Sequence, residues 1–192
     1  MPELPRALLL GSGGVGTAVA RSLAGLADVV TGDPERIRVD PGTDVAVLAV
    51  QRPRPDIADR LGEACHAASV PWCAVTQLAH VAEIGPMVVP GRTPCHDCWR
   101  RRRRSHAEDE RLARLVEAAA IGSRGAWFDG ELPGVNDQAA SLVAYEAMQL
   151  VHGRQAIPPG GMGDFRYLDA LDGEISRHLF SSVGGCPRCG TR

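Results

Sequence analysis

The chain contains no lysine. All 21 of its basic residues are arginine, in a sequence of 192 residues. Chemistry that needs a lysine amine, such as a Schiff base, is therefore excluded. Lysine is also a common point charge at phosphate-binding sites, so any cation at such a site in this chain has to be an arginine.

Long apolar runs are absent as well. No stretch approaches the roughly 18 consecutive apolar residues of a membrane span, and the opening Met-Pro-Glu-Leu-Pro-Arg lacks the apolar core of a secretory signal. We therefore expect a cytoplasmic protein without a membrane partner. A formal net charge of only −2 gives no reason to expect nucleic acid or another polyanion as partner.

Length and composition are those of one ordinary globular domain. A chain of this size can fill one core but is short for two full-sized domains, and 44% hydrophobic and 23% charged residues are typical values. We expect a single domain over 1–192, with a nucleotide-binding-type half over 1–78 and a metal-bearing half over 79–192.

Four of the six cysteines form two Cys-x-x-Cys pairs, Cys95 with Cys98 and Cys186 with Cys189, separated by 87 residues. Two such pairs supply the four soft ligands of a tetrahedral zinc site. This site would hold a C-terminal hairpin to the helix that follows Trp99. A redox pair or a disulfide is the alternative, but each explains only one pair at a time, and nothing indicates an oxidising compartment.

The N-terminal stretch predicts a strand, a glycine turn and a helix. The apolar run 7–10 leads into the turn, and apolar residues then recur at helical spacing through Leu26. The turn residues are Gly11, Gly13, Gly14 and Gly16. Such a turn allows close approach to a phosphate at the start of a helix, and Asp33, after a second strand at 29–31, lies where a ribose-binding carboxylate is expected. The alternative is a turn that serves the fold alone.

The next elements predict an α/β fold. A buried strand is expected over 44–50, a helix over 55–68 and a further strand over 71–75. Alternation with short connections favours a Rossmann-like, mostly parallel, doubly wound sheet. Cys65 and Cys73 are interpreted as ordinary buried small residues.

The second half follows a different pattern. Residues 80–84 and 87–89 flank Gly-Pro and predict two short antiparallel strands or one bent strand. Apolar residues predict a helix over 105–120 that carries Leu112, Leu115, Val116 and Ala119, and another from Asn136 or Asp137 to about His152. Alternation around Asp-Gly at 172–173 predicts a C-terminal antiparallel hairpin before the second cysteine pair.

Five consecutive arginines, 100–104, stand between the first cysteine pair and the predicted 105–120 helix. One short run in a slightly acidic chain, without interleaved aromatics, favours a solvated helical face over nucleic-acid binding. We interpret this face, together with a loop over 121–133 that carries Trp127 and Phe128, as a surface for an acidic protein or peptide.

Together, three features resemble the ThiF-type, ubiquitin-activating-enzyme-like superfamily. They are the glycine turn at 11–16, the segment Gly-Pro-x-Val-Val-Pro-Gly-x-x-x-Cys-x-x-Cys at 85–98, and the terminal Cys-Pro-x-Cys. Within that superfamily, residues 85–99 are most similar to the cyclodehydratase partner proteins of thiazole/oxazole-modified peptide (RiPP) biosynthesis. The order of these features covers most of the chain.

The resemblance implies a ThiF-like α/β fold with structural zinc, in a pathway that converts Cys, Ser or Thr side chains of a ribosomal precursor peptide into azolines. It also implies a YcaO-type partner that uses ATP, which this chain would stimulate or supply with substrate. The chain departs from the family in two ways. It begins almost directly at the first strand, without the winged-helix module that usually grips a leader peptide, and the short connection 34–40 lacks the Arg, Gln and Lys that clamp ATP in adenylating members.

Two functions of different classes follow. One is a non-catalytic partner in peptide modification, and the other is an ATP-dependent, adenylate-forming enzyme that activates a carboxylate. A bare glycine turn holds phosphate but does little to stabilise charge at the α-phosphorus, which favours the first. An NAD-dependent oxidoreductase would explain the turn and Asp33 but neither cysteine pair. ATP binding and ThiF-like pairing into a homodimer are left open by the sequence.

Overall fold

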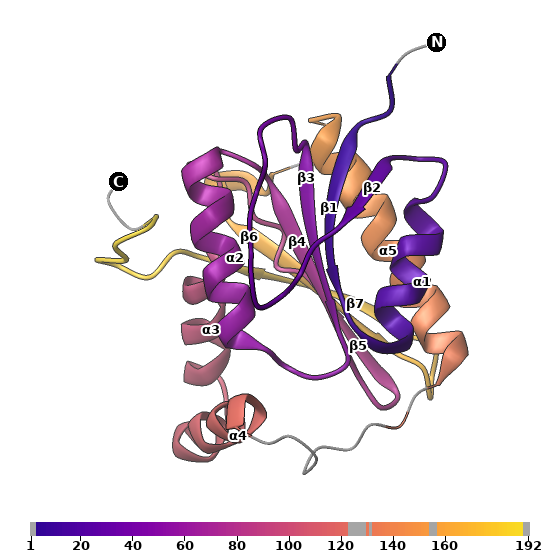
Figure 1. The fold of residues 1–192 in the computed structure, drawn as a ribbon. Helices are drawn as coiled ribbons and strands as arrows, with labels where there is room; N and C mark the ends of the chain where they lie inside the picture. The colour runs from indigo at the N-terminus through magenta and orange to yellow at the C-terminus, as the bar shows by residue number, and fades with distance from the viewer. Residues whose placement is uncertain (1–2, 123–129, 131, 154–156, 190–192) are drawn as a thin grey trace.

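The computed structural model describes residues 3–122, 130, 132–153 and 157–189. Its strands form one seven-stranded sheet in the order β2-β1-β3-β4-β5-β6-β7 (Figure 1). The strands are β1 Arg6–Gly11, β2 Asp28–Thr31, β3 Val45–Val50, β4 Trp72–Leu78, β5 Val81–Ile84, β6 Gly163–Asp169 and β7 Ile175–Phe180. The sheet therefore runs without interruption through both predicted halves of the chain.

The sheet is mixed rather than mostly parallel. β2, β1, β3 and β4 pair in parallel, whereas β4–β5, β5–β6 and β6–β7 pair antiparallel. Parallel neighbours need a crossover of about a dozen residues or more. Only residues 79–80 join β4 to β5, and only 170–174 join β6 to β7, so these pairs have to be antiparallel. The predicted hairpin is confirmed, and it extends the same sheet.

Helices cover both faces of the sheet. α1 (Gly13–Leu23) and α5 (Pro133–Val151) lie on one face, and α2 (Pro55–Ala68) and α3 (His96–Ser105) on the other, with α4 (Glu110–Gly122) at the lower end of α3 (Figure 1). Leu9 and Val47 pack toward α1 and α5, while Leu8, Leu10 and Leu48 pack toward α2. These strands are continuously apolar because both of their faces are buried.

The connection from β2 to β3, which the structure describes throughout, contains no helix. Ile37 and Val39 instead pack against the α2-side core, so an extended segment covers this part of the sheet. The predicted strand at 87–89 is reduced to a single antiparallel bridge between Val88 and Trp72. No helix among the described residues is long and apolar enough to cross a membrane.

Several predicted helix boundaries were wrong. α1 ends at Leu23, and Leu26 is exposed. α5 begins three residues before Asn136, which is buried inside the helix instead of capping it. The predicted 105–120 helix is divided, because α3 ends at Ser105 and Asp109 accepts a hydrogen bond from the Leu112 N–H, which caps a new helix. Trp127 and Phe128 lie outside the described residues.

Candidate metal centre and nucleotide-binding turn

The two cysteine pairs come together at one end of the sheet. Cys95 immediately precedes α3 and Cys98 lies in its first turn, whereas Cys186 and Cys189 follow β7. The last residue of β7, Phe180, is buried in one apolar cluster with Trp99, Cys98 and Cys186. This packing turns the C-terminal segment back onto the start of α3, so four ligands from distant parts of the sequence converge, as predicted.

The four sulfurs fit a tetrahedral metal ion. Sγ–Sγ distances are 3.6 Å for Cys95–Cys186, 3.4 Å for Cys98–Cys189 and 3.8 Å for Cys186–Cys189, and all four atoms lie within 4.8 Å of one another. Four sulfurs at ~2.3 Å from a central zinc would lie ~3.8 Å apart. A disulfide would need ~2.05 Å, and all four cysteines are free thiols. The site therefore has the donor set and spacing to hold a metal ion.

Backbone N–H groups point at the sulfurs. The Cys95 N–H donates to the Cys189 Sγ and the Val183 N–H to the Cys98 Sγ, both at 3.3 Å. Burial raises the pKa of the Cys95 thiol to about 11. Burial acts the same way on Cys186, but N–H donors from Arg188 and Cys189 outweigh it and lower its pKa to about 7. Metal binding would have to displace protons from such thiols, and this makes it pH-dependent.

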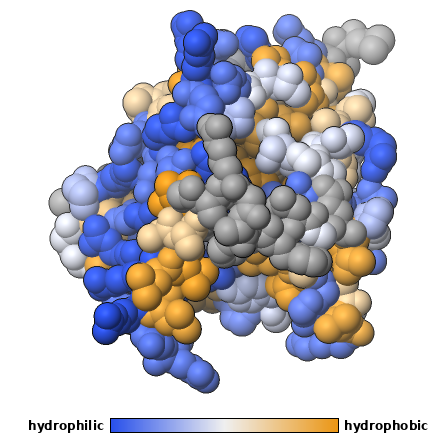
Figure 2. Space-filling model, turned by 60° about the horizontal axis from the view of Figure 1, so that its bottom comes forward, coloured by the Kyte–Doolittle hydropathy of each residue, from blue (hydrophilic) through white to orange (hydrophobic). Residues whose placement is uncertain are grey.

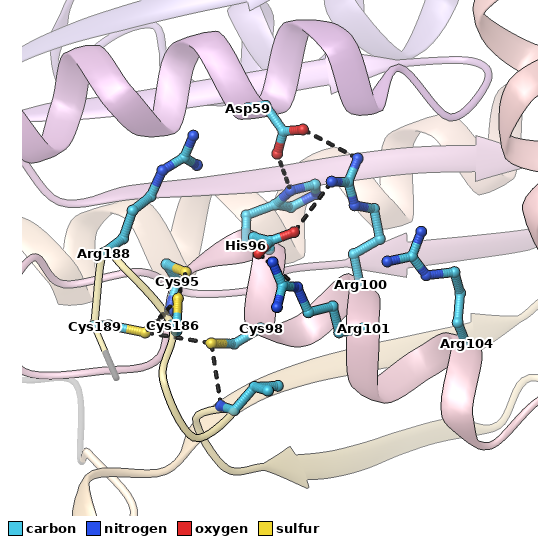
Figure 3. A network of polar contacts seen from close by, with 12 residues as sticks. Asp59, Cys95, His96, Cys98, Arg100, Arg101, Arg104, Cys186, Arg188 and Cys189 are labelled. Carbon is cyan, nitrogen blue, oxygen red and sulfur yellow. Dashed lines mark hydrogen bonds and ion pairs between the residues drawn. The ribbon is translucent and has the colours of Figure 1, made fainter. Parts of the chain in front are cut away.

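A polar network ties this centre to α2 (Figure 3). His96, beside Cys95, is buried, and its Nδ1 lies 3.4 Å from the Asp59 carboxylate. Arg100 contacts Asp59 at 3.0 Å and Asp97 at 3.1 Å. Burial raises the pKa of Asp59, but the His96 hydrogen bond and nearby Arg100 charge outweigh it and lower the pKa below its usual value. α2 and α3 are therefore joined by charged and polar side chains.

The arginine run is not simply a solvated face. Arg100 forms ion pairs with Asp59 and Asp97. Arg103 pairs with Glu83, and Arg104 pairs with Glu117. Arg103 also lies over the Trp99 ring, 5.4 Å from its centroid. Replacing the whole run would therefore disturb the fold as well as the surface, which corrects the expectation of a solvated helical face.

Sequence reasoning overlooked the acidic partners of the arginines. Asp97 lies three and four residues before Arg100 and Arg101, which is helical spacing for ion pairs and was a detectable signal. Glu83 is buried on β5, and burial raises its pKa although the Arg103 charge opposes this. Nothing local in the sequence indicates that Glu83 faces an arginine 20 residues away.

A groove between α3 and the β6–β7 hairpin was also overlooked. It has a volume of 710 Å³, within the range of ligand sites, and its wall combines aromatic side chains with Arg102, Arg103 and His106. The ring residues that line it are Trp99, Phe165, Tyr167, His178 and Phe180. Strand alternation was the available signal, because Phe165 and Tyr167 share one face of β6 and meet His178 across the hairpin. None of the described residues that line this groove is acidic.

The glycine turn joins β1 to α1 as predicted. Gly11 and Gly16 pack so closely that a Cβ on Gly16 would lie 2.9 Å from the Gly11 backbone, so these two glycines are needed for the fold itself. Gly13 has a φ of +65° and is covered by Gln51, because a Cβ there would meet the Gln51 side chain at 1.8 Å. Gly14 follows in the first turn of α1.

A shallow pocket of 290 Å³ lies at this turn, lined by Gly11, Ser12, Gly13 and Gly16 together with residues of α1 and the end of β2. Asp33 is not among its described lining residues. The Asp33 carboxylate accepts a hydrogen bond from the Glu35 N–H at 2.8 Å. Arg60 on α2 donates to the Pro34 and Glu35 carbonyls, so the segment after β2 is held onto α2.

No protein-family model matches the chain, and no curated protein sequence matches it either. Solved structures do share its fold. A heterocyclase in complex with substrate and cofactor is 20% identical with a TM-score of 0.71, and the match covers 97% of this chain and 26% of that one. The heterocyclase TruD is 20% identical with a TM-score of 0.68, covering 97% and 28%.

E. coli MccB in complex with AMPCPP and MccA is 16% identical with a TM-score of 0.67, and the match covers 97% of this chain and 67% of that chain. This chain thus spans about a quarter of the length of the heterocyclases and two thirds of MccB. Its fold, a mixed seven-stranded α/β sheet, is similar to that of a segment in each of these proteins.

Proposed function

We propose that this chain is a ThiF-like partner protein in ribosomal peptide modification, which presents a precursor peptide to, or stimulates, a YcaO-type ATP-dependent cyclodehydratase that forms azolines. The observation that carries the proposal is a contrast between two sites. At the glycine turn, Gly13 is covered by Gln51 and Asp33 accepts a hydrogen bond from the Glu35 N–H. The groove beside the cysteine cluster is an open volume of 710 Å³ lined by aromatic side chains. Similarity of fold to heterocyclases supports the same pathway.

Zinc is the metal we propose for Cys95, Cys98, Cys186 and Cys189, because four thiolates at these separations suit a closed tetrahedral site. When bound, zinc would supply structural cross-linking and no open coordination position for chemistry. The cysteines would then hold β7 and the C-terminal segment against the start of α3. This support fixes one wall of the groove relative to the other.

The groove is the site we propose for the peptide. Aromatic rings offer large rigid contact area, and arginine and histidine favour acidic side chains. Arg102 donates to the Ser181 and Ser182 carbonyls, which fixes its position at the groove. A peptide segment that combines aromatic or aliphatic residues with an acidic residue would match this lining.

Reconstitution tests the role. The components are this chain, a YcaO-type enzyme encoded beside it and the precursor peptide encoded with them, supplied with ATP and Mg²⁺. We expect the peptide to lose the mass of one water per azoline, and the rate to fall at least ~10-fold when this chain is omitted, because presentation replaces a bimolecular encounter. A rate that does not depend on this chain would contradict the proposal.

An adenylate-forming enzyme is the second candidate, favoured by the likeness to MccB. Charge developing at an α-phosphate needs positioned cations, and losing one such donor costs ~10²–10³ in rate. The chain has no lysine, and the arginines after β2 are Arg36 and Arg38, in a connection without a helix. We propose that weak nucleotide binding through Gly11, Gly13, Gly14, Gly16 and Asp33 is compatible with this arrangement, but that turnover is not.

We therefore expect no ATP–pyrophosphate exchange above background from the isolated chain with its peptide. The matched variant is Asp33→Ala, which removes the carboxylate without the steric clash with Gln51 that a Gly13 substitution would introduce. Robust exchange by the wild-type chain that Asp33→Ala abolishes would promote the adenylating enzyme to first place.

A further inference from the structure

α4 has its apolar side turned outward. Leu112, Leu115 and Val116 are 57%, 59% and 43% exposed, and Ala119 on the same side is exposed too. A surface helix normally buries its apolar stripe and exposes its polar side. Figure 2 shows apolar surface on the face of the molecule to which α4 belongs. The four apolar residues that the sequence pattern placed on one helix therefore lie on its exposed side.

The inner side of α4 is small and polar. Ala113 and Glu117 are the partly buried residues there, and Glu117 pairs with Arg104 of α3 at 3.3 Å. The Asp109 cap and a surface pair between Arg114 and Glu110 support the helix locally. α4 is thus a formed helix attached by an ion pair, with its large apolar side chains facing away from the core.

The spacing of the exposed apolar residues of α4 indicates what kind of surface would cover them. Leu112, Leu115, Val116 and Ala119 stand at positions i, i+3, i+4 and i+7, the anchor pattern of a helix that docks into an apolar groove on another protein. A second copy packed helix to helix would bury only these four side chains, roughly half of the ~800 Å² per partner that a stable interface needs. A partner that also contacts the neighbouring groove would bury more. The charges of α4 balance, with Glu110 and Glu117 against Arg111 and Arg114, so the helix has no net positive charge to favour an anionic membrane surface.

The position of α4 indicates which protein would cover its apolar side. His106 and Ala107, which line the peptide groove, are followed directly by the Asp109 cap of α4. A protein docked on α4 would therefore lie beside a peptide held in the groove. The enzyme that modifies the peptide has to reach this place, whereas other partners do not.

We infer that α4 is the docking helix for the ATP-using enzyme of the proposed function, with Leu112, Leu115 and Val116 seated in an apolar groove of that enzyme. This inference rests on the proposed function and adds to it the surface through which the two proteins bind. It places the contact with the enzyme on the apolar side of α4, whereas the sequence analysis predicted a partner surface on the arginine run.

The test measures binding of the YcaO-type enzyme to the full chain by calorimetry, with the precursor peptide present. The double variant Leu112→Glu/Leu115→Glu should weaken binding by ~10²-fold, because each exposed anchor removed from such an interface costs about tenfold. The matched control is Leu171→Glu, at the β6–β7 turn, where the leucine is 78% exposed. The affinity of this variant for the enzyme should equal that of the wild-type chain. Zinc content and circular dichroism should be the same in all three proteins.

The remaining results are distinguishable. Unchanged binding by the double variant overturns the inference and leaves the proposed function standing, whereas no binding by the wild-type chain overturns both. Sedimentation of the isolated chain tests whether a second copy binds α4. Pelleting with equimolar phosphatidylcholine–phosphatidylglycerol vesicles tests whether a membrane surface does. A dimer, or vesicle binding, that the double variant abolishes would assign α4 to a second copy or to a membrane and overturn the inference.

Discussion

Replacing Cys186 with serine should reduce bound zinc from one per chain to near zero and release the C-terminal segment. Cys186 is buried among the other three sulfurs, and a hydroxyl is a poor substitute for the fourth thiolate. Structural zinc contributes an apparent ~10–16 kcal/mol in small zinc modules, which is comparable with the whole ~5–15 kcal/mol stability of a typical domain. Even partial loss should lower the melting temperature by ~10 °C or more.

Two measurements check this. Elemental analysis of protein purified without chelator gives the zinc stoichiometry, and limited trypsin digestion reports release of the segment, because cleavage after Arg188 requires that residue to leave its contact with Glu63. Cys65→Ala is the matched control, since Cys65 is equally buried but packs against α2-side residues; zinc should stay at one per chain. A metal-free wild-type protein that is fully folded and protected at Arg188 would end the zinc proposal.

Replacing Arg103 with serine should be the most damaging single change in the arginine run. It leaves the buried Glu83 carboxylate without the guanidinium 3.1 Å away. Removing one partner of a buried pair costs ~3–5 kcal/mol, and the lower end applies because the Arg103 side chain is 39% exposed. Arg101→Ser breaks the pair with Asp97, in which the Arg101 side chain is 46% exposed. This change should cost less than ~1 kcal/mol of stability.

Urea unfolding of the two variants measures the difference. The double variant Arg103→Ser/Glu83→Gln should recover much of the lost stability, because the amide carries no charge to leave unpaired. Equal stabilities for Arg103→Ser and Arg101→Ser would show that the Glu83 pair is not important for folding.

The Arg103→Ser penalty should also grow with pH. Burial raises the pKa of Glu83 above its ordinary value, so the folded state holds this proton more tightly than the unfolded chain does. Stability from such a group is greatest below the unfolded pKa and falls as pH rises through the folded pKa. Without Arg103 the folded pKa rises further, so the stability difference from wild type should increase as the pH is raised above the ordinary pKa of a glutamate. A pH-independent difference would contradict this assignment.

The antiparallel half of the sheet shows where sequence reasoning was sufficient. Asp172 and Gly173 between two alternating stretches predicted the hairpin, and the structure places it at β6 and β7. The cysteine pairs likewise predicted their own convergence, because together they supply the complete ligand set of one tetrahedral metal ion. These signals are local: turn chemistry, side-chain alternation and ligand spacing depend on neighbouring residues, and they can be recognised without knowledge of the rest of the chain.

What the sequence by itself determined about this protein is most of the order of strands and helices, the α/β class and the four-cysteine cluster. Only the tertiary structure decided that the sheet is half antiparallel, that Arg103 faces a buried Glu83, and that Leu112, Leu115 and Val116 face outward. An amphipathic pattern predicts that a helix has an apolar side but not what covers it. That depends on which distant residues occupy the core, and here α4 is held from its polar side by an ion pair to α3.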